Sequence, residues 1–234
     1  MFFKDSLVTG KIIRRYKRFL ADIALDTGGE ITAYVPNTGS MKECWAPGWK
    51  AALMHEIEPG RKLEYTLKML HNGRTWIGID TGLTNKLVYE ALVNHKIPEL
   101  SGYSQIIPEF KVEDSRLDFL LKNGIDPDCY TEVKNVTLIG ENNRAEFPDA
   151  VTSRGQKHLN TLMRCKIKGY RAIMLYVIQR EDTEGFSPAD TIDPRYAELL
   201  GDACRVGVEV LVYQCSLSLS EIKINRKVDS IYIK

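Results

Sequence analysis

Turn-forming residues recur at short intervals through the first 80 positions, and this spacing limits the possible folds more than any other feature of the chain. Short apolar runs lie between the turns, near 7–13, 19–25, 31–35, 51–57, 63–70 and 76–79. The turns are marked by Gly28-Gly29, Pro36-Asn37-Thr38-Gly39, Pro47-Gly48, Pro59-Gly60 and Asn72-Gly73. Such punctuation is typical of a meander of antiparallel strands. Asn72-Gly73 is the strongest hairpin signal, because tight hairpin turns require residues that tolerate a positive φ.

The number of strands in this region indicates a small barrel. If residues 7–25 form one long bent strand, the apolar runs give five strands. Five strands in a segment of this length are typical of an OB-type β-barrel, a fold that commonly binds oligonucleotides. We therefore predict an OB-fold-like, nucleic-acid-binding domain over residues 1–81.

The pattern changes near Thr81, where longer helical and buried-strand signals begin. Leu87, Val88, Ala91 and Leu92 have helical spacing, and a second helix is expected from Thr152 or Ser153 to Gly169. Asp193-Pro194 predicts the start of a third helix, with an Asp N-cap and Pro at the first helical position, and Gly207 ends it. Strands are expected near 110–112, 117–121, 130–139, 172–178 and 208–212, the last being the final strand. This order predicts an α/β domain with a mixed central sheet over residues 82–234.

Composition and charge exclude several classes of protein. The 32 basic and 31 acidic side chains nearly balance, which argues against tight, unspecific coating of DNA. The cysteines are scattered without a CxxC pair, so neither a zinc site nor a disulfide framework is indicated, and a reducing cytoplasm fits best. The N-terminus, MFFKDSLVTG, lacks the apolar segment of a signal peptide, and no stretch approaches the roughly 20 apolar residues that cross a bilayer. We expect a soluble, cytoplasmic protein with no membrane partner.

A basic cluster near the N-terminus is the first candidate binding surface. Five cations fall within eight residues and can meet a phosphate backbone: Lys11, Arg14, Arg15, Lys17 and Arg18. The alternative is a solvated basic strand and turn. Together with the loop at 36–39, the cluster predicts a groove on the barrel that contacts nucleic-acid phosphates. Its candidate contacts are Arg14, Arg15, Lys17, Arg18, Asn37 and Thr38.

Asp118, Glu132 and Lys134 are the candidate chemical site. Alternation along the strand 116–121 is expected to turn Leu117, Phe119 and Leu121 to one face and Asp118 to the other, while Glu132 and Lys134 share a face. If the two strands form a hairpin, the three charges converge, and a cation bound by both carboxylates and a backbone carbonyl would offset their burial. Oxygen ligands favour Mg²⁺ or Mn²⁺. The alternative is a structural ion pair at the end of the sheet.

Arg154 and His158 lie near the start of the second expected helix. They are four residues apart and therefore share one helix face, where an anion would also meet free backbone N–H groups. We take Arg154 as a nucleic-acid contact and His158 as a catalytic candidate, against the alternative that His158 is a polar flank residue. Asp149 is expected to cap this helix.

Several motifs resemble one known family. They are RYKRFLAD (15–22), PNTGSM (36–41), SRLDFLL (115–121), TEVKNVTL (131–138), FPDAVTSRGQKHL (147–159) and FSPADTIDPRYAELL (186–200). In this order they resemble the sugar fermentation stimulation protein family over nearly the whole chain.

The resemblance implies an N-terminal OB-fold followed by a domain similar to the PD-(D/E)XK nucleases. It implies that Asp118 and Glu132 are metal carboxylates and that Lys134 is the catalytic lysine. It adds Glu109, on the preceding strand, as a supporting acid and metal ligand. Members of the family are described as DNA-binding proteins linked to the regulation of sugar (maltose) metabolism.

Two functions remain open at this point, since a third, an OB-fold interaction module bound to a protein partner, lacks a distinct sequence feature. The first is a DNA-binding protein with a nuclease-like metal site, and the second is an active Mg²⁺- or Mn²⁺-dependent phosphodiesterase acting on DNA or RNA. The carboxylate and lysine set favours cleavage, because a protein that only binds has little need for paired acids near phosphates. A related fold can nonetheless keep binding alone. The sequence leaves open the choice between DNA and RNA and the oligomeric state, a homodimer included.

Overall fold

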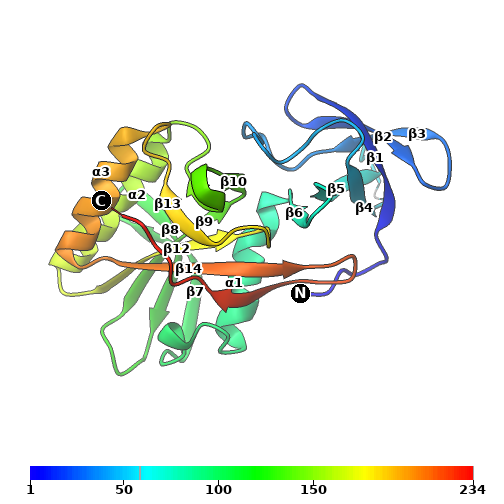
Figure 1. The fold of residues 1–234 in the computed structure, drawn as a ribbon. Coiled ribbons are helices and arrows are strands. Elements are labelled where there is room, and N and C mark those ends of the chain that lie inside the picture. The colour runs from blue at the N-terminus through cyan, green and yellow to red at the C-terminus, as the bar shows by residue number, and fades with distance from the viewer. Residues whose placement is uncertain (58, 234) are drawn as a thin grey trace.

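The structure is a computed structural model that describes residues 1–57 and 59–233, and it joins a β-barrel to a larger α/β part (Figure 1). The strands of the first part are β1 (Val8–Tyr16), β2 (Leu20–Leu25), β3 (Glu30–Tyr34), β4 (Lys50–His55), β5 (Tyr65–His71) and β6 (Trp76–Gly78). They pair in the order β3-β2-β1-β4-β5-β6, and a parallel bridge between Tyr34 and Thr66 joins β3 to β5. In the described residues this bridge closes β1 to β5 into a mixed barrel, so the predicted five-stranded OB-type barrel is confirmed.

The barrel closes around a core of small and branched side chains. Ala21, Ile23 and Ala33 on β2 and β3 are fully buried, and Leu53 and Leu67 meet them from β4 and β5. β1 and β2 approach closely at Gly10, where a Cβ atom would lie 2.4 Å from the carbonyl oxygen of Ala24. Glycine at this position therefore lets the two strands pair.

The count of barrel strands agrees with the prediction, but the five strands are not the five that were predicted. Residues 7–25 form two antiparallel strands and not one bent strand, because Lys17 and Arg18 both adopt positive φ (49° and 66°) and turn the chain back. The predicted strand at 76–79 is the short β6, which extends the sheet beyond β5. It forms the predicted hairpin at Asn72-Gly73, where Oδ1 of Asn72 accepts hydrogen bonds from the N–H groups of Arg74 and Thr75.

The C-terminal part is built on a mixed sheet, as predicted. Its order in the described residues is β15-β14-β12-β9-β8-β7, in which β12 is parallel to β9 and β14 and the outer pairs are antiparallel. A smaller sheet has the order β10-β11-β13. The strands are β7 (Gln105–Val112), β8 (Ser115–Lys122), β9 (Cys129–Val136), β10 (Leu138–Ile139), β11 (Arg144–Phe147), β12 (Arg171–Ile178), β13 (Gly185–Pro188), β14 (Glu209–Leu217) and β15 (Ile222–Lys227).

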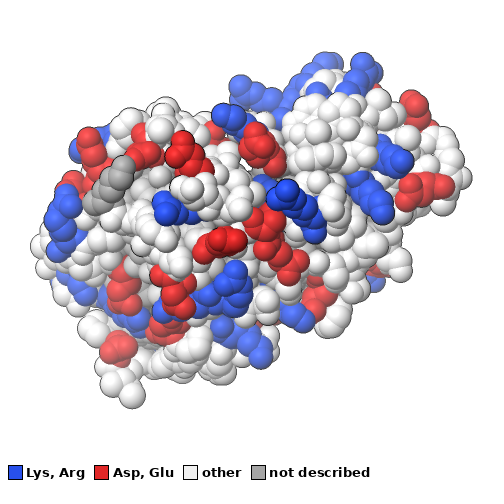
Figure 2. All heavy atoms as spheres, in the orientation of Figure 1, with Lys and Arg blue, Asp and Glu red and all other residues white. Residues whose placement is uncertain are grey.

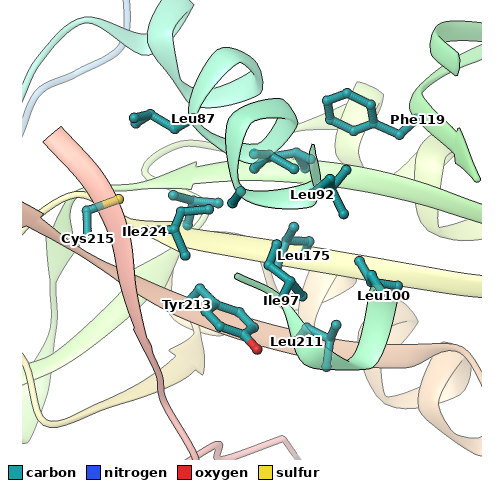
Figure 3. Close-up of a cluster of buried hydrophobic side chains, with 14 of the residues drawn as sticks. Leu87, Leu92, Ile97, Leu100, Phe119, Leu175, Leu211, Tyr213, Cys215 and Ile224 are labelled. Carbon is teal, nitrogen blue, oxygen red and sulfur yellow. The ribbon is translucent and has the colours of Figure 1, made fainter. Parts of the chain in front are cut away.

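Helices cover both faces of the larger sheet (Figure 1). The helical segments are η1 (Thr81–Leu83), α1 (Thr84–Val93), η2 (Pro98–Leu100), η3 (Glu141–Asn143), α2 (Ser153–Ile167) and α3 (Pro194–Val206). Alternate residues of β12 separate two cores: Leu175 packs with Leu87 and Leu92 of α1, whereas Met174 and Tyr176 pack under α2 and α3. Figure 3 shows the first of these cores.

The helix ends follow the predicted signals. Thr152 caps α2 by accepting a hydrogen bond from the N–H of Gly155, and Asp193 caps α3 by accepting one from the N–H of Tyr196. Gly207 ends α3 in the left-handed region, with φ 98°. None of the helices in the described part of the chain is long and apolar enough to cross a membrane.

The first residues of the chain pack on the larger sheet, which the sequence did not predict. β14 is not the final strand, because β15 pairs with it after a turn. The N-terminal amine of Met1 donates a hydrogen bond to the carbonyl of Ile222, and Phe2 bridges to Glu221. The first residues therefore contact the β14–β15 hairpin before the chain enters the barrel at Val8.

Candidate functional site

The larger sheet opens between β8 and β9, and Asp118 occupies the opening. The ladder between these strands pairs Phe119 with Thr131 and does not continue to Asp118 in the described residues. Instead, Oδ2 of Asp118 accepts a hydrogen bond from the backbone N–H of Val133 at 2.7 Å, and Oδ1 accepts one from the side-chain amide of Asn85 at 2.7 Å. The opening thus fixes this carboxylate beside β9 and beside the start of α1.

The predicted alternation along β8 is wrong at this point. Leu117 packs in the core under α2 and α3, whereas Phe119 and Leu121 pack in the core with α1. The strand therefore changes the face that it presents between Leu117 and Phe119, at Asp118 itself. Strict period-two alternation could not predict this break, which falls where the pairing of β8 to β9 ends and where its pairing to β7 skips Asp118.

Glu132 lies on β9 with its two oxygens in different surroundings. Lys134 donates a hydrogen bond to Oε1, and Nδ1 of His158 on α2 is hydrogen-bonded to the same oxygen. Nζ of Lys134 and Nδ1 of His158 are 3.3 Å apart. Oε2 is buried and has no hydrogen-bond partner among residues 1–57 and 59–233. The carboxylate, 2% exposed, is therefore only half satisfied.

The surroundings shift the pKa values of the two carboxylates in opposite directions. Burial raises the pKa of Asp118 above its ordinary value, and the neighbouring charge of Glu132 raises it further. Burial also acts to raise the pKa of Glu132, but the hydrogen bond to His158 and the charge of Lys134 outweigh it, and the pKa is lowered overall. The geometry thus favours an ionised Glu132 next to an Asp118 that resists ionisation.

The residues present suit a hard cation but do not surround one. A buried carboxylate oxygen without a partner, next to a second carboxylate, is the donor set that Mg²⁺, Mn²⁺ or Ca²⁺ accepts. Among the described residues, no group of three or more His, Cys, Asp or Glu side chains is arranged to hold a metal ion. Asp118 and Glu132 would therefore share a cation with backbone carbonyl oxygens, water or a substrate phosphate.

Glu109 does not join these two carboxylates. It lies on β7 with φ 55°, and its side chain is 59% exposed and faces Arg116, with 3.4 Å between the nearest nitrogen and oxygen. Its assignment as a supporting metal ligand stays a prediction that this arrangement does not favour.

The residues of α2 divide between the site and the solvent. His158 is 3% exposed and contacts Glu132, whereas Arg154, one turn earlier, is exposed. Asp149 does not cap the helix as predicted, because Thr152 does so. Instead, Oδ2 of Asp149 accepts a hydrogen bond from the hydroxyl of Ser40 at 3.0 Å.

The predicted basic surface is exposed at the turn between β1 and β2 and less so at Arg15. Lys17 and Arg18 are exposed at the turn between β1 and β2, and Arg14, 69% exposed, pairs with Asp22. Nη2 of Arg15 instead donates to the backbone carbonyls of Arg18, Asn37 and Gly39, and Nη1 to that of Ser40. These contacts do not favour the prediction that Arg15 contacts nucleic acid, because its guanidinium braces the loop at 36–40. Figure 2 shows Lys and Arg side chains gathered along the upper edge of the barrel.

Asn37 and Thr38, the two predicted contacts in the loop, also differ in exposure. Asn37 is 9% exposed, and its Oδ1 accepts a hydrogen bond from the N–H of Gly39, so it shapes the loop. Thr38 is exposed. Of the two, only Thr38 offers its side chain to a ligand.

Asn85 is the site residue that the sequence did not identify. It is the second residue of α1, and its amide orients Asp118 across 33 positions of sequence. An Asn in the first turn of a helix is common, so its spacing gave no signal.

Two family models match the chain. The SfsA N-terminal OB domain matches residues 13–79, and the sugar fermentation stimulation protein RE domain matches residues 82–221. A sugar fermentation stimulation protein homolog of Geotalea uraniireducens is 50% identical over 222 residues, covering 94% of this chain and 95% of the relative. The homolog of Pseudoalteromonas atlantica is 46% identical over 235 residues, covering 99% and 100%. The solved structure of Pyrococcus furiosus SfsA in complex with Ca²⁺ is similar with a TM-score of 0.86 and 28% identity, covering 100% of this chain and 98% of that one.

Proposed function

This chain belongs to the sugar fermentation stimulation protein family, and from that premise we propose that it binds nucleic acid and holds a divalent cation between Asp118 and Glu132. The barrel supplies the binding surface, and the opening between β8 and β9 supplies the cation site. A contact connects the barrel to the C-terminal part: Ser40 of the loop at 36–40 donates a hydrogen bond to Asp149 in the segment before α2.

One observation carries the cation site. Oε2 of Glu132 is buried without a partner in the described residues, and the Asp118 carboxylate is close enough for the two charges to interact. A buried ionised oxygen without a partner is costly, and a cation is the ligand that removes this cost for both acids at once. The Pyrococcus furiosus relative was solved with Ca²⁺, an oxygen-seeking divalent cation. We propose Mg²⁺ or Mn²⁺ as the working cation here, because both bind one or two carboxylates together with substrate phosphates.

The nucleic acid is proposed to be DNA, held on the barrel and at the start of α2. The exposed cations of the β1–β2 turn, with Arg14, Thr38 and Arg154, are the proposed phosphate contacts. The five cysteines are all free, which suits a protein that works in the reducing cytoplasm.

Cleavage is the second candidate function, and Lys134 favours it. A bound cation would polarise a phosphodiester oxygen and lower the pKa of a water molecule. Lys134, hydrogen-bonded to Glu132, would stabilise the charge that develops on the phosphate during attack. A regulator of sugar metabolism needs DNA binding alone, so the ammonium group beside the acids is the feature that distinguishes a phosphodiesterase.

Calorimetry with Mn²⁺, Mg²⁺ and Ca²⁺ tests the cation site directly. We expect the wild-type protein to bind Mn²⁺ at one site, and Glu132→Gln to abolish that binding. Glu198→Gln removes an exposed acid on α3 that pairs with Arg195, and it serves as the matched control that should bind normally. Absence of Mn²⁺ binding by the wild type, or equal binding by Glu132→Gln, would overturn the cation site.

A further inference from the structure

The loop at 36–40 is hydrogen-bonded to the segments that precede α1 and α2. The hydroxyl of Thr81, which begins η1, donates a hydrogen bond to the carbonyl of Pro36 at 2.9 Å, and the hydroxyl of Ser40 donates to Asp149 at 3.0 Å. η1 leads into α1, which orients Asp118, and Asp149 precedes α2, which contacts Glu132. Figure 1 shows the segment between β3 and β4 extending from the barrel toward the C-terminal part.

This loop is braced and closely packed. Arg15 holds two of its carbonyl groups, each at 3.0 Å, and a Cβ atom on Gly39 would lie 2.9 Å from Oδ2 of Asp149. Hydrogen bonds hold this loop to Thr81, to Asp149 and to Arg15. Moving the loop is costly because several of these bonds must break together. It therefore stays fixed beside η1 and beside the segment before α2.

The acids themselves are recessed. Glu132 is 2% exposed, and the side chain of Lys134 is 13% exposed. A DNA duplex is stiff, and bending it sharply within one binding site is costly. A single strand can bend at each nucleotide, so it can bring one phosphate to the recessed acids.

The outer face of the barrel next to the loop presents aromatic rings. Tyr16, Leu20 and Tyr34 form one row across β1, β2 and β3, because Leu20 pairs with both tyrosines. Paired residues of antiparallel strands share a face, and the neighbouring pair Ala21 and Ala33 is fully buried, so this row faces outward. Tyr34 is 39% exposed and comes two residues before Pro36.

Cationic side chains lie beside both rings. The guanidinium of Arg14 lies 5.0 Å from the centre of the Tyr16 ring, and Arg61 and Lys62 line a shallow cleft with Tyr34. Aromatic faces beside cations are the surface on which unpaired bases stack while their phosphates are neutralised. A duplex hides the faces of its bases, so it gains little from such rings.

We infer that the ligand of this site is single-stranded nucleic acid, whose bases stack on Tyr34 and Tyr16 while the strand runs past Thr38 to Asp118 and Glu132. This inference rests on the proposed function and specifies the substrate class of the same site. Because stacking is common to all bases, DNA and RNA strands share this chemistry, and the experiment separates them.

Binding is measured by fluorescence anisotropy in EDTA at fixed salt, with a labelled DNA strand, the same strand as a duplex, and an RNA strand of that sequence. We expect a single strand to bind at least about tenfold more tightly than the duplex. Tyr34→Leu keeps apolar bulk but removes the flat ring, and it should weaken single-strand binding about 5- to 150-fold, the range that one stacked base supplies. Tyr34→Phe should bind normally.

Tyr89→Ala is the matched control, because Tyr89 is an exposed tyrosine (45%) on α1. This variant should change neither the affinity for single strands nor the affinity for the duplex. Equal affinity for duplex and single strand, or unchanged single-strand binding by Tyr34→Leu, overturns this inference while leaving the proposed function intact. If no nucleic acid binds even at low salt, the proposed nucleic-acid function is itself wrong, whereas Mn²⁺ binding is decided separately by calorimetry.

Discussion

Oδ2 of Asp118 accepts a hydrogen bond from the backbone N–H of Val133 at 2.7 Å, where the ladder between β8 and β9 ends. The side chain takes the place of a main-chain acceptor and is thereby held next to Glu132. Burial first, and the charge of Glu132 second, raise the pKa of Asp118. An acid kept in an environment that opposes its charge is typical of a site selected for function at some loss of stability.

Asp118→Asn should therefore fold at least as stably as the wild type near pH 7. Because the pKa of Asp118 is raised by folding, its stabilising contribution is complete below the ordinary value of about 3.9 and is lost as pH rises through the raised value. Asparagine has no charge, so this loss of stability does not occur, and its Oδ1 can still accept a hydrogen bond from the N–H of Val133. We expect a melting temperature equal to or up to about 4 °C above that of the wild type, measured in EDTA.

The same variant separates stability from cation binding. Across pH 4–8, the difference in melting temperature should grow with pH, while Mn²⁺ binding falls at all pH values. A variant that is less stable than the wild type at pH 7 in EDTA would contradict this account of the Asp118 environment.

Arg15→Ala should destabilise the loop at 36–40 without acting on phosphates directly. The substitution removes the donors to the carbonyls of Asn37 and Gly39, which then lose their main-chain tie to β1. Amide hydrogen exchange should rise at 36–40, and the midpoint of urea unfolding should fall. Lys17→Ala, at the neighbouring exposed position, should leave both measurements unchanged.

The triple variant Arg14→Ala, Lys17→Ala and Arg18→Ala should weaken nucleic-acid binding through lost phosphate contacts. Each phosphate contact contributes about 0.9 to the slope of log K against log salt for a duplex and about 0.7 for a single strand. The slope should therefore become flatter by up to roughly 2 to 3. An unchanged slope would remove the β1–β2 turn from the binding surface.

Asp193 should contribute to acid stability. Burial acts to raise its pKa, but hydrogen bonds from the N–H groups of Thr152 and Tyr196 and from Gln156 lower it overall. A lowered pKa means that the contribution is present above about pH 3.9 and is lost as pH falls through the folded value. Asp193→Ala should cost about 1–2 kcal/mol of unfolding free energy at pH 7. In urea titrations this difference should shrink below pH 4; a difference independent of pH would contradict it.

Local signals in the sequence predicted most of the fold. Asp193-Pro194 and Gly207 fixed both ends of α3, and the apolar run at 172–178 predicted the central strand β12. The sequence did not reveal the hairpin at Lys17-Arg18, because two basic residues at positive φ are unusual and carry no turn signal. β15 was missed because its exposed positions are polar or charged and only Ile222 and Ile224 are buried.

The site was predictable in its residue types but not in its arrangement. The spacing of Glu132 and Lys134 placed them on one face, and the structure joins them by a hydrogen bond. Position in sequence could not show that Asp118 sits at a break in pairing, nor that Asn85 orients it, since both depend on contacts between distant elements. It also could not separate Arg15, which braces a loop, from its exposed neighbours.

Lys134→Ala should abolish cleavage while leaving most nucleic-acid binding, if the protein is a phosphodiesterase. The ammonium group contacts Glu132 and lies 3.3 Å from His158. It is therefore part of the carboxylate site and not of the exposed basic surface of the barrel. A group that acts chiefly on the developing charge of the transition state lowers the rate more than the affinity. Single-turnover cleavage with Mn²⁺, beside anisotropy in EDTA, measures the two separately. Cleavage that survives equally in Lys134→Ala and Asp118→Asn would indicate a contaminating nuclease, and binding without any Mn²⁺-dependent cleavage by the wild type would leave a DNA-binding protein.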